Sequence, residues 1–204
     1  MQFRLQAGTL ADQEVDALII PVGKDRELTP EGAEVNRRLG GALEQALTVA
    51  DFTGEVGKTV VLSTLGRLPA HWLVATGTGG ADTRSADDIR RAWGVATRAA
   101  RDAGATTIAS PPPTASSLNV ETTYRVAVEG VCLASYRFLE HRTQNLPKRD
   151  IQEVTFTGSG QDAERGIELG EKIAGGVILA RNLGNQPPDI IYPGRLAEIA
   201  RDVA

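Results

Sequence analysis

The chain has 204 residues, a hydrophobic fraction of 41% and a formal net charge of −4, values typical of a soluble globular protein. Cys132 is the only cysteine, which excludes an internal disulfide and a Cys-based zinc site. The basic residues are scattered, no apolar run approaches the ~20 residues of a membrane helix, and the N-terminus lacks a signal-peptide pattern. We therefore expect a cytoplasmic protein that binds neither membranes nor nucleic acid.

The first half of the chain alternates strand and helix patterns. The first segment alternates polar and apolar residues, which predicts an edge strand. The next is an apolar run rich in β-forming residues, typical of a strand buried on both faces. Thr29 and Pro30 then mark a helix start, with Thr29 as the N-cap, and one apolar face continues at helical spacing as far as Ala50. In chain order, this half predicts strands at 3–7 and 15–22, a helix at 29–50, and strands at 59–63 and 72–76.

The second half repeats this alternation. Ser85 and Asp88 are spaced as a capping box at the start of a helix that Gly104 ends. A run of three prolines makes a rigid connection after the next strand, and a polar stretch at 141–150 precedes the last strand. In chain order, this half predicts a helix at 85–104, a strand at 106–109, a helix at 120–139, a strand at 151–157, and helices at 162–181 and 194–204.

Strands that alternate with helices predict an α/β fold with a mostly parallel sheet and helices on both faces. We expect one α/β domain at 1–158, a linker helix at 159–182, and a separate segment at 183–204. The helical pattern of the last segment is still running at Ala204. It is therefore expected to pack on a part of the protein that lies outside this sequence.

Two glycine-containing motifs resemble ligand loops. GEVGKT, at residues 54–59, lacks the first glycine of a phosphate loop, because that position is Phe52, and a strand follows it instead of a helix. GTGG, at residues 77–80, lacks the third glycine of a dinucleotide fingerprint, because that position is Asp82. We expect both motifs to be turns.

No catalytic or metal-binding constellation is evident in the sequence. His71 and His141 are far apart and neither has a second ligand at metal spacing, so both are interpreted as surface or hydrogen-bonded histidines. Cys132 lies on an apolar helical stripe, where cysteine usually acts as a small buried hydrophobe. The residues alone predict no catalytic, cofactor-binding or metal-binding site.

The C-terminal stretch resembles the junction between the two domains of the leucyl (cytosol) aminopeptidase family. In that family a helix ends in Ala-Arg-x-Leu, Asn-x-Pro-Pro follows, and a proline precedes a helix that contains Leu-Ala. The upstream segments VDALIIPV, GGALEQALTVADFTGEVGKT and VEGVCLASYRFLEHR also resemble the family's N-terminal domain in order and spacing. The matching junction residues are Ala180, Arg181, Leu183, Asn185, Pro187, Pro188, Pro193, Leu196 and Ala197.

The resemblance implies a fold and a parent enzyme. The fold would be a macro-domain-like three-layer α/β/α domain with a mostly parallel mixed sheet, followed by the linker helix. The parent would be a hexameric, two-domain metalloexopeptidase that removes N-terminal residues from peptides with two divalent ions, Zn, Mn or Mg. Residues 183–204 would then be the truncated start of its catalytic domain.

The family's metal ligands lie in motifs resembling GKGITFDSGG and NTDAEGR, and this sequence contains neither string. We therefore expect the 204-residue chain alone to be inactive, with no cofactor, and to serve assembly and access restriction beside its own catalytic domain. The alternative is a stand-alone macro-like module that binds a nucleotide derivative or a protein. Macro domains typically carry Asn-Ala-Ala-Asn after Val-Asp-Ala and a hydrophobic residue, and here the corresponding segment 20–23 reads Ile-Pro-Val-Gly.

Overall fold

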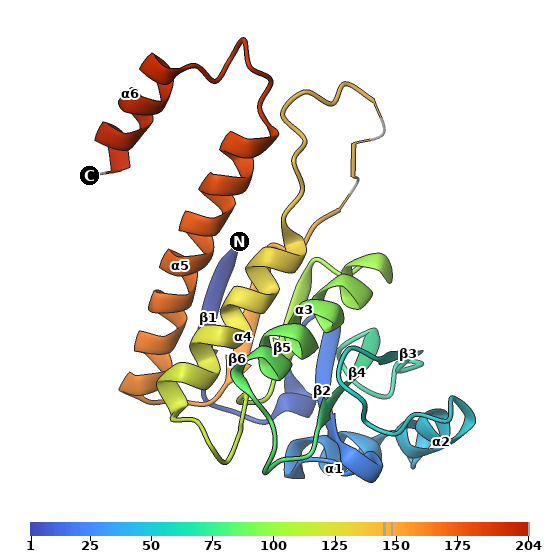
Figure 1. The fold of residues 1–204 in the computed structure, drawn as a ribbon. Helices are drawn as coiled ribbons and strands as arrows, with labels where there is room; N and C mark the ends of the chain where they lie inside the picture. Colours follow the sequence, from blue (N-terminus) through green and yellow to red (C-terminus); the bar gives the residue numbers. More distant parts are fainter. Residues whose placement is uncertain (145, 148, 204) are drawn as a thin grey trace.

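The computed structural model describes residues 1–144, 146–147 and 149–203. At its centre is a six-stranded sheet in the order β1-β6-β5-β2-β4-β3 (Figure 1). Every neighbouring pair is parallel except β3 and β4, which confirms the mostly parallel mixed sheet, and β1 lies at an edge as expected. The strands are β1 (Gln2–Gln6), β2 (Ala17–Gly23), β3 (Thr59–Ser63), β4 (Trp72–Gly79), β5 (Thr107–Ser110) and β6 (Glu153–Thr157).

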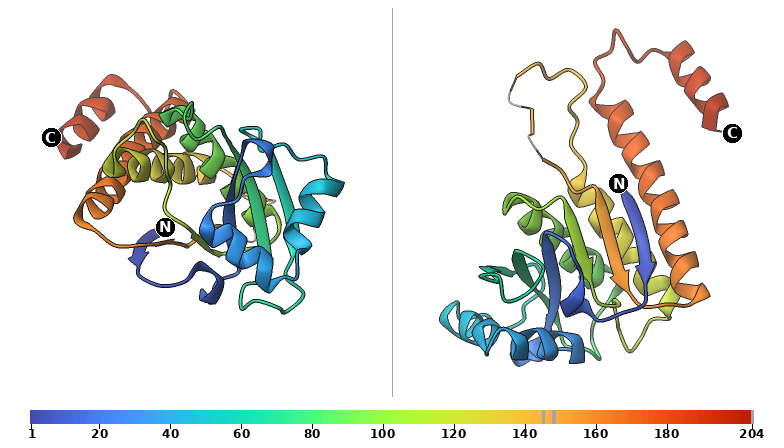
Figure 2. Two further views of the ribbon diagram at one scale, coloured as in Figure 1. Left: turned by 90° about the horizontal axis from the view of Figure 1, so that it is seen from below. Right: turned by 180° about the vertical axis from the view of Figure 1, so that it is seen from behind.

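Helices cover both faces of the sheet, as predicted (Figures 1 and 2). Two short helices pack on one face, two longer ones pack on the other, and α5 lies along α4 at the outside of that second layer. The chain also makes two 3₁₀ turns, η1 (Leu10–Asp12) and η2 (Lys24–Arg26). The helices are α1 (Pro30–Arg38), α2 (Ala42–Val49), α3 (Ala86–Asp102), α4 (Val120–Ser135), α5 (Gln161–Asn185) and α6 (Pro193–Val203).

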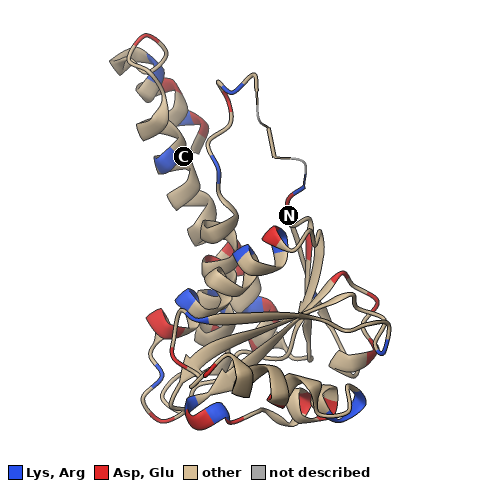
Figure 3. Ribbon diagram, turned by 90° about the vertical axis from the view of Figure 1, so that its right-hand side faces the viewer, with Lys and Arg blue, Asp and Glu red and all other residues tan. Residues whose placement is uncertain are grey.

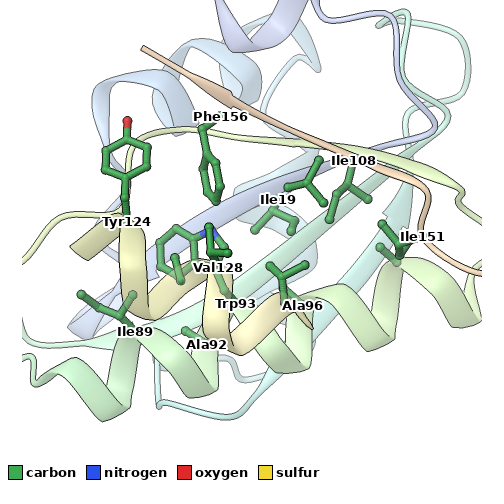
Figure 4. Packing of buried hydrophobic residues seen from close by; sticks show 14 of the residues in the cluster. Ile19, Ile89, Ala92, Trp93, Ala96, Ile108, Tyr124, Val128, Ile151 and Phe156 are labelled. Atoms are coloured by element: carbon green, nitrogen blue, oxygen red, sulfur yellow. The ribbon is translucent and has the colours of Figure 1, made fainter. Parts of the chain in front are cut away.

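Strand β2 separates the two halves of the core. All seven of its residues are buried, which confirms a strand covered on both faces. Leu18 and Ile20 contribute to the cluster under α1 and α2, whereas Ile19 contributes to the cluster under α3 and α4. In the second cluster, Trp93 and Phe156 are the largest fully buried side chains (Figure 4). Trp93, Tyr124 and Phe156 therefore lie in this layer, whereas Phe52 is buried in the other.

The helix-start signals in the sequence have the structural effect expected of them. The Gly32 amide donates to the Thr29 hydroxyl over 3.2 Å, which caps α1. Ser85 and Asp88 form a capping box, since the Asp88 amide donates to Ser85 Oγ and the Ser85 amide donates to Asp88 Oδ2. These local hydrogen bonds replace the backbone partners that a first helical turn lacks.

The single helix expected over 29–50 was wrong in one respect. The structure breaks it into α1 and α2 at Gly40 and Gly41, whose φ angles are +66° and +84°. Glycine adopts this left-handed region without a steric penalty, so the chain can turn there. Val35, Leu39 and the leucines of α2 still join one buried cluster, so the apolar face itself was predicted correctly.

Two helix ends also differ from the predictions. α4 ends at Ser135 and not at Leu139, because Tyr136 is extended, with φ −59° and ψ 131°. α5 continues to Asn185, four residues beyond its expected end. The two differences are related, since the segment that leaves α4 forms hydrogen bonds with the last turn of α5.

Candidate functional site

A small cavity lies at the carboxyl ends of β2 and β4. In open α/β sheets, this edge is where ligands usually bind. The cavity has a volume of about 220 Å³, and its lining comes from the β2–α1 connection, the end of β4 and the loops before α3 and α4. The lining residues are Pro21, Gly23, Glu27, Leu28, Thr29, Pro30, Thr78, Ala81, Arg84 and Thr114.

Arg84 is the charged side chain most firmly held at this edge. Only 9% of its surface is exposed. Its guanidinium donates to the Thr78 carbonyl over 2.9 Å, to the Thr114 carbonyl over 2.6 Å and to the Gly79 carbonyl over 3.4 Å. Arg84 therefore joins the loop that follows β4 to the loop that follows β5. Burial lowers the pKa of this guanidinium, while the charges of Glu27 and Asp88 oppose that shift.

The two glycine motifs pack against each other. GEVGKT contains the expected turn, at Val56 and Gly57, but the prediction of a turn at GTGG was wrong, because residues 77–79 form the end of β4. Gly54 and Gly79 have φ angles of +81° and +69°. A Cβ atom on Gly77 would lie 2.0 Å from the Glu55 carbonyl oxygen, so only glycine fits there. The Gly79 amide donates to the Gly54 carbonyl over 2.9 Å, and the Gly77 amide donates to the Lys58 carbonyl over 3.0 Å. These amides are thus already paired within the protein and do not form a phosphate cradle.

The two histidines and the cysteine remain apart. His71 is exposed just before β4, and His141 is exposed after α4, where its Nε2 lies 2.8 Å from Gln186 Oε1. Cys132 is half-buried on α4, and burial raises the pKa of its thiol to about 11. The described residues offer no cluster of three or more His, Cys, Asp or Glu side chains for a metal ion. They therefore form no site for the two divalent ions, which the resemblance assigns to the catalytic part of the parent enzyme.

The outer side of α5 leaves a stripe of apolar side chains uncovered. Ala163, Ile167 and Ala174 are buried, and α5 packs against α4 along this side. The apolar stripe on α5 consists of three residues spaced four apart, Leu169, Ile173 and Val177, which are 39%, 38% and 37% exposed. Side chains four residues apart lie on one face of a helix. The stripe is therefore an apolar surface that the described residues cover only in part.

The segment beyond α5 is exposed as well. None of the described residues of α6 is buried, and the ribbon carries this helix away from the sheet (Figures 1 and 2). Ile190, Tyr192, Leu196 and Val203 are all exposed large apolar residues. Charged residues of both signs are interspersed along the helices and loops of the ribbon (Figure 3).

Polar contacts hold the far end of α5 against the segment that follows α4. Arg181 lies over the Tyr136 ring, with Cζ 5.5 Å from the ring centroid. The Asn185 side-chain amide donates to the Tyr136 hydroxyl over 3.1 Å, and the Gln186 amide donates to Glu140. We call this set of residues the junction brace. Sequence reasoning missed both the brace and Arg84, because each depends on contacts between distant parts of the chain.

None of the described helices combines the length and the apolar character that a membrane span needs.

Comparison with sequence families gives one match over most of the chain. The sequence model of the "Cytosol aminopeptidase family, N-terminal domain" matches residues 19–145. A relative from Alkaliphilus metalliredigens, named "Probable cytosol aminopeptidase", is 29% identical over 212 aligned positions, which span 100% of this chain and 42% of the relative. A relative of the same name from Geobacter sp. (strain M21) is 37% identical, with 84% of this chain and 35% of the relative covered. The chain thus spans about two fifths of the length of these relatives.

Solved structures show the same relationship. A mutant of tomato leucine aminopeptidase superposes with a TM-score of 0.82 at 26% identity, over 100% of this chain and 42% of that one. The macro domain of ganglioside induced differentiation associated protein 2 superposes with a TM-score of 0.61 at 13% identity, over 83% of each chain. The second likeness concerns the fold alone, and it confirms the macro-like α/β/α architecture. Together with the family match, these structures show that the chain belongs to the cytosol aminopeptidase family and contains that family's N-terminal domain.

Proposed function

We propose that this chain is the non-catalytic N-terminal part of a longer, metal-dependent leucyl aminopeptidase that removes N-terminal residues from peptides in the cytoplasm. In this proposal residues 1–158 form the macro-like domain, 159–182 the linker helix, and 183–204 the first segment of the catalytic domain. The N-terminal domain would serve assembly of a hexamer and restrict access of substrates to the active site.

The observation that carries the proposal is the apolar stripe on α5. Leu169, Ile173 and Val177 are each more than a third exposed, although fully burying such a side chain is worth roughly 1.5–3 kcal/mol. A contiguous exposed apolar surface is typical of an interaction site. The relatives are more than twice as long as the part that aligns with this chain, so a second domain is available to cover this surface.

The macro-like likeness suggests a second function, binding of a nucleotide derivative, but the site geometry does not favour it. The amides of Gly77 and Gly79 already donate to main-chain carbonyls, and Arg84 holds together the loops that border the cavity. A diphosphate held by the glycine amides, as in a phosphate loop, would have to displace their bonds to these carbonyls. The family relationship therefore supports the aminopeptidase proposal over the stand-alone module.

The proposal is tested by assaying two polypeptides side by side with a leucine p-nitroanilide substrate and added Mn²⁺ or Zn²⁺. One ends at Ala204, and the other continues along the same reading frame. We expect hydrolysis only by the longer polypeptide, and a chelator should abolish it. Chelator-sensitive hydrolysis by the purified 204-residue chain would contradict the proposal, and so would a stop codon directly after Ala204.

The role of the stripe is tested in the longer polypeptide by the substitution Ile173→Lys. A lysine there would place a charge in the proposed domain contact, so we expect loss of activity together with a lower thermal midpoint. The matched control is Val49→Lys on α2, where valine is 82% exposed and lies outside the stripe. Equal behaviour of the two variants would argue against a domain contact at the stripe.

A further inference from the structure

The cavity at the carboxyl ends of β2 and β4 has a positively charged wall. Arg84 is nine-tenths buried, and arginine stays protonated under all physiological conditions. Among the described residues no carboxylate forms an ion pair with it, since its partners are three main-chain carbonyls. A buried cation that lines a cavity and has no carboxylate partner favours an anionic group there.

The first turn of α1 strengthens this preference. Thr29 and Pro30 line the cavity, and they are the N-cap and the first residue of the nine-residue helix α1. The amino end of a helix carries a partial positive charge that stabilises anions within about one turn. Two independent elements, α1 and the loop before α3, therefore place positive potential in the same cavity.

The cavity also contains a negative group and an apolar part. Glu27 lines it, is exposed, and acts on Arg84 through its charge without forming an ion pair. Pro21, Leu28 and Ala81 supply apolar surface. A ligand that matches all three features carries an anion, a cation and a small apolar group within a few ångströms. The volume of about 220 Å³ is below the ~300–1,000 Å³ typical of pockets for drug-sized ligands, so the ligand must be small.

We propose that this cavity binds a free α-amino acid with an aliphatic side chain. Its carboxylate pairs with Arg84, its ammonium group pairs with Glu27, and its side chain lies against Pro21, Leu28 and Ala81. The biological sense of the site rests on the proposed function, because free amino acids are what an aminopeptidase releases. In that case the cavity would bind a product of the enzyme.

The binding test uses calorimetry on the 204-residue chain with L-leucine as the probe. We expect saturable binding of L-leucine. N-acetyl-L-leucine lacks the ammonium group and L-leucinamide lacks the carboxylate, so each should bind roughly tenfold more weakly or worse, since each loses a charge-assisted contact. Equal binding of all three compounds, or no saturable binding of L-leucine at millimolar concentrations, would overturn the proposal. Tighter binding of ADP-ribose than of L-leucine would overturn it as well.

Two substitutions and one control locate the site and leave the Arg84 bonds in place. Ala81→Phe should fill the cavity from an exposed loop position and abolish L-leucine binding, whereas Ala33→Phe, at an exposed position on α1 outside the lining, should not. Glu27→Gln should weaken L-leucine roughly tenfold and leave N-acetyl-L-leucine unchanged. Unchanged L-leucine affinity in Ala81→Phe would place any binding elsewhere and refute the site.

The result of the binding test can be distinguished from the result of the test of the proposed function. The binding test needs no peptidase activity and uses the chain alone, whereas the proposed function is tested by hydrolysis in the longer polypeptide. An active long polypeptide whose N-terminal domain ignores L-leucine would refute only the amino-acid site.

Discussion

The Asp16 side chain joins the start of β2 to the start of β5. Its Oδ2 accepts hydrogen bonds from the Thr106 amide and hydroxyl, both at 2.7 Å, and from the Thr107 amide at 3.0 Å. We expect Asp16→Asn to lower the free energy of unfolding by about 1–2 kcal/mol, because the charge that strengthens these bonds is lost while the site stays partly solvated. Urea denaturation at neutral pH measures this change. The control is Asp102→Asn, whose exposed pair with Arg101 should contribute less than about 0.5 kcal/mol.

The same carboxylate predicts a pH dependence. Burial raises the pKa of Asp16, but the hydrogen bonds from Thr106 and Thr107 outweigh burial and hold that pKa below its ordinary value of 3.8. A group whose pKa is lower in the folded state stabilises the fold above the unfolded pKa, and this contribution is lost as pH falls through the folded pKa. The stability difference between the unchanged chain and Asp16→Asn should therefore be constant near neutral pH and shrink below pH 3.8. A difference that stays constant in acid would contradict this account.

Some of the structurally important residues could be predicted from the sequence and others could not. Thr29, Ser85 and Asp88 were predictable as caps, because a cap depends on residues three positions apart. Arg84 and Asp16 were not, because their partners lie up to 91 positions away and no local spacing reports them. The cavity was missed for the same reason, since four separate segments line it.

Helices α3 and α4 come into close backbone contact at two glycines, Gly94 and Gly130. A Cβ atom on Gly130 would lie 2.1 Å from the Arg90 carbonyl oxygen, and one on Gly94 would lie 3.2 Å from the Gly130 carbonyl oxygen. Gly130→Ala must push the helices apart, so we expect it to cost about 1–3 kcal/mol of unfolding free energy or more. Gly175→Ala in α5 meets no atom within 4 Å and should instead stabilise the isolated chain by about 0.5–1 kcal/mol. Denaturant unfolding of the two variants distinguishes them, and an equal loss in both would contradict the close-approach argument.

At the level of elements, periodicity located each strand and most helices to within a few residues. It failed where tertiary contacts compete with local spacing. The apolar face continued across Gly40 and Gly41, so periodicity could not reveal that the backbone turns there. Apolar residues likewise continue past the end of α4 in the sequence. The helix nevertheless ends there, because Tyr136 turns away and contacts the last turn of α5 in the junction brace.

The whole molecule consists of a packed α/β body and an exposed C-terminal extension. Because none of the described residues of α6 is buried, we expect a chain that ends at Gln186 to keep its thermal midpoint within about 2 °C of the longer chain. A chain that ends at Gly158 should have a lower thermal midpoint. It lacks α5 and therefore loses the buried side chains Ala163, Ile167 and Ala174. Differential scanning calorimetry measures both. A fall of more than about 5 °C in the first chain would show that α6 stabilises the body.

The fold class followed from the alternation of strands and helices, and the family followed from the junction motif, so both could be predicted from the sequence. The uncovered stripe on α5 could not be distinguished from a buried face, because apolar spacing is the same in both cases. Only the packing of α5 against α4 shows which side of the helix is satisfied by this chain.

The length of α5 has a mechanical consequence. At about 1.5 Å per residue its 25 residues span about 37 Å, so it acts as a lever arm that extends well past the body. Its base is fixed by Gly166 and Gly170, where a Cβ atom would lie 2.4 Å and 2.6 Å from carbonyl oxygens of α4. From this fulcrum to Asn185 the helix is about 22–28 Å long, so a tilt of about 3° moves the far end by about 1 Å. The junction brace supports that far end at Tyr136, so the direction in which the chain leaves the domain is set at two points about 22 Å apart.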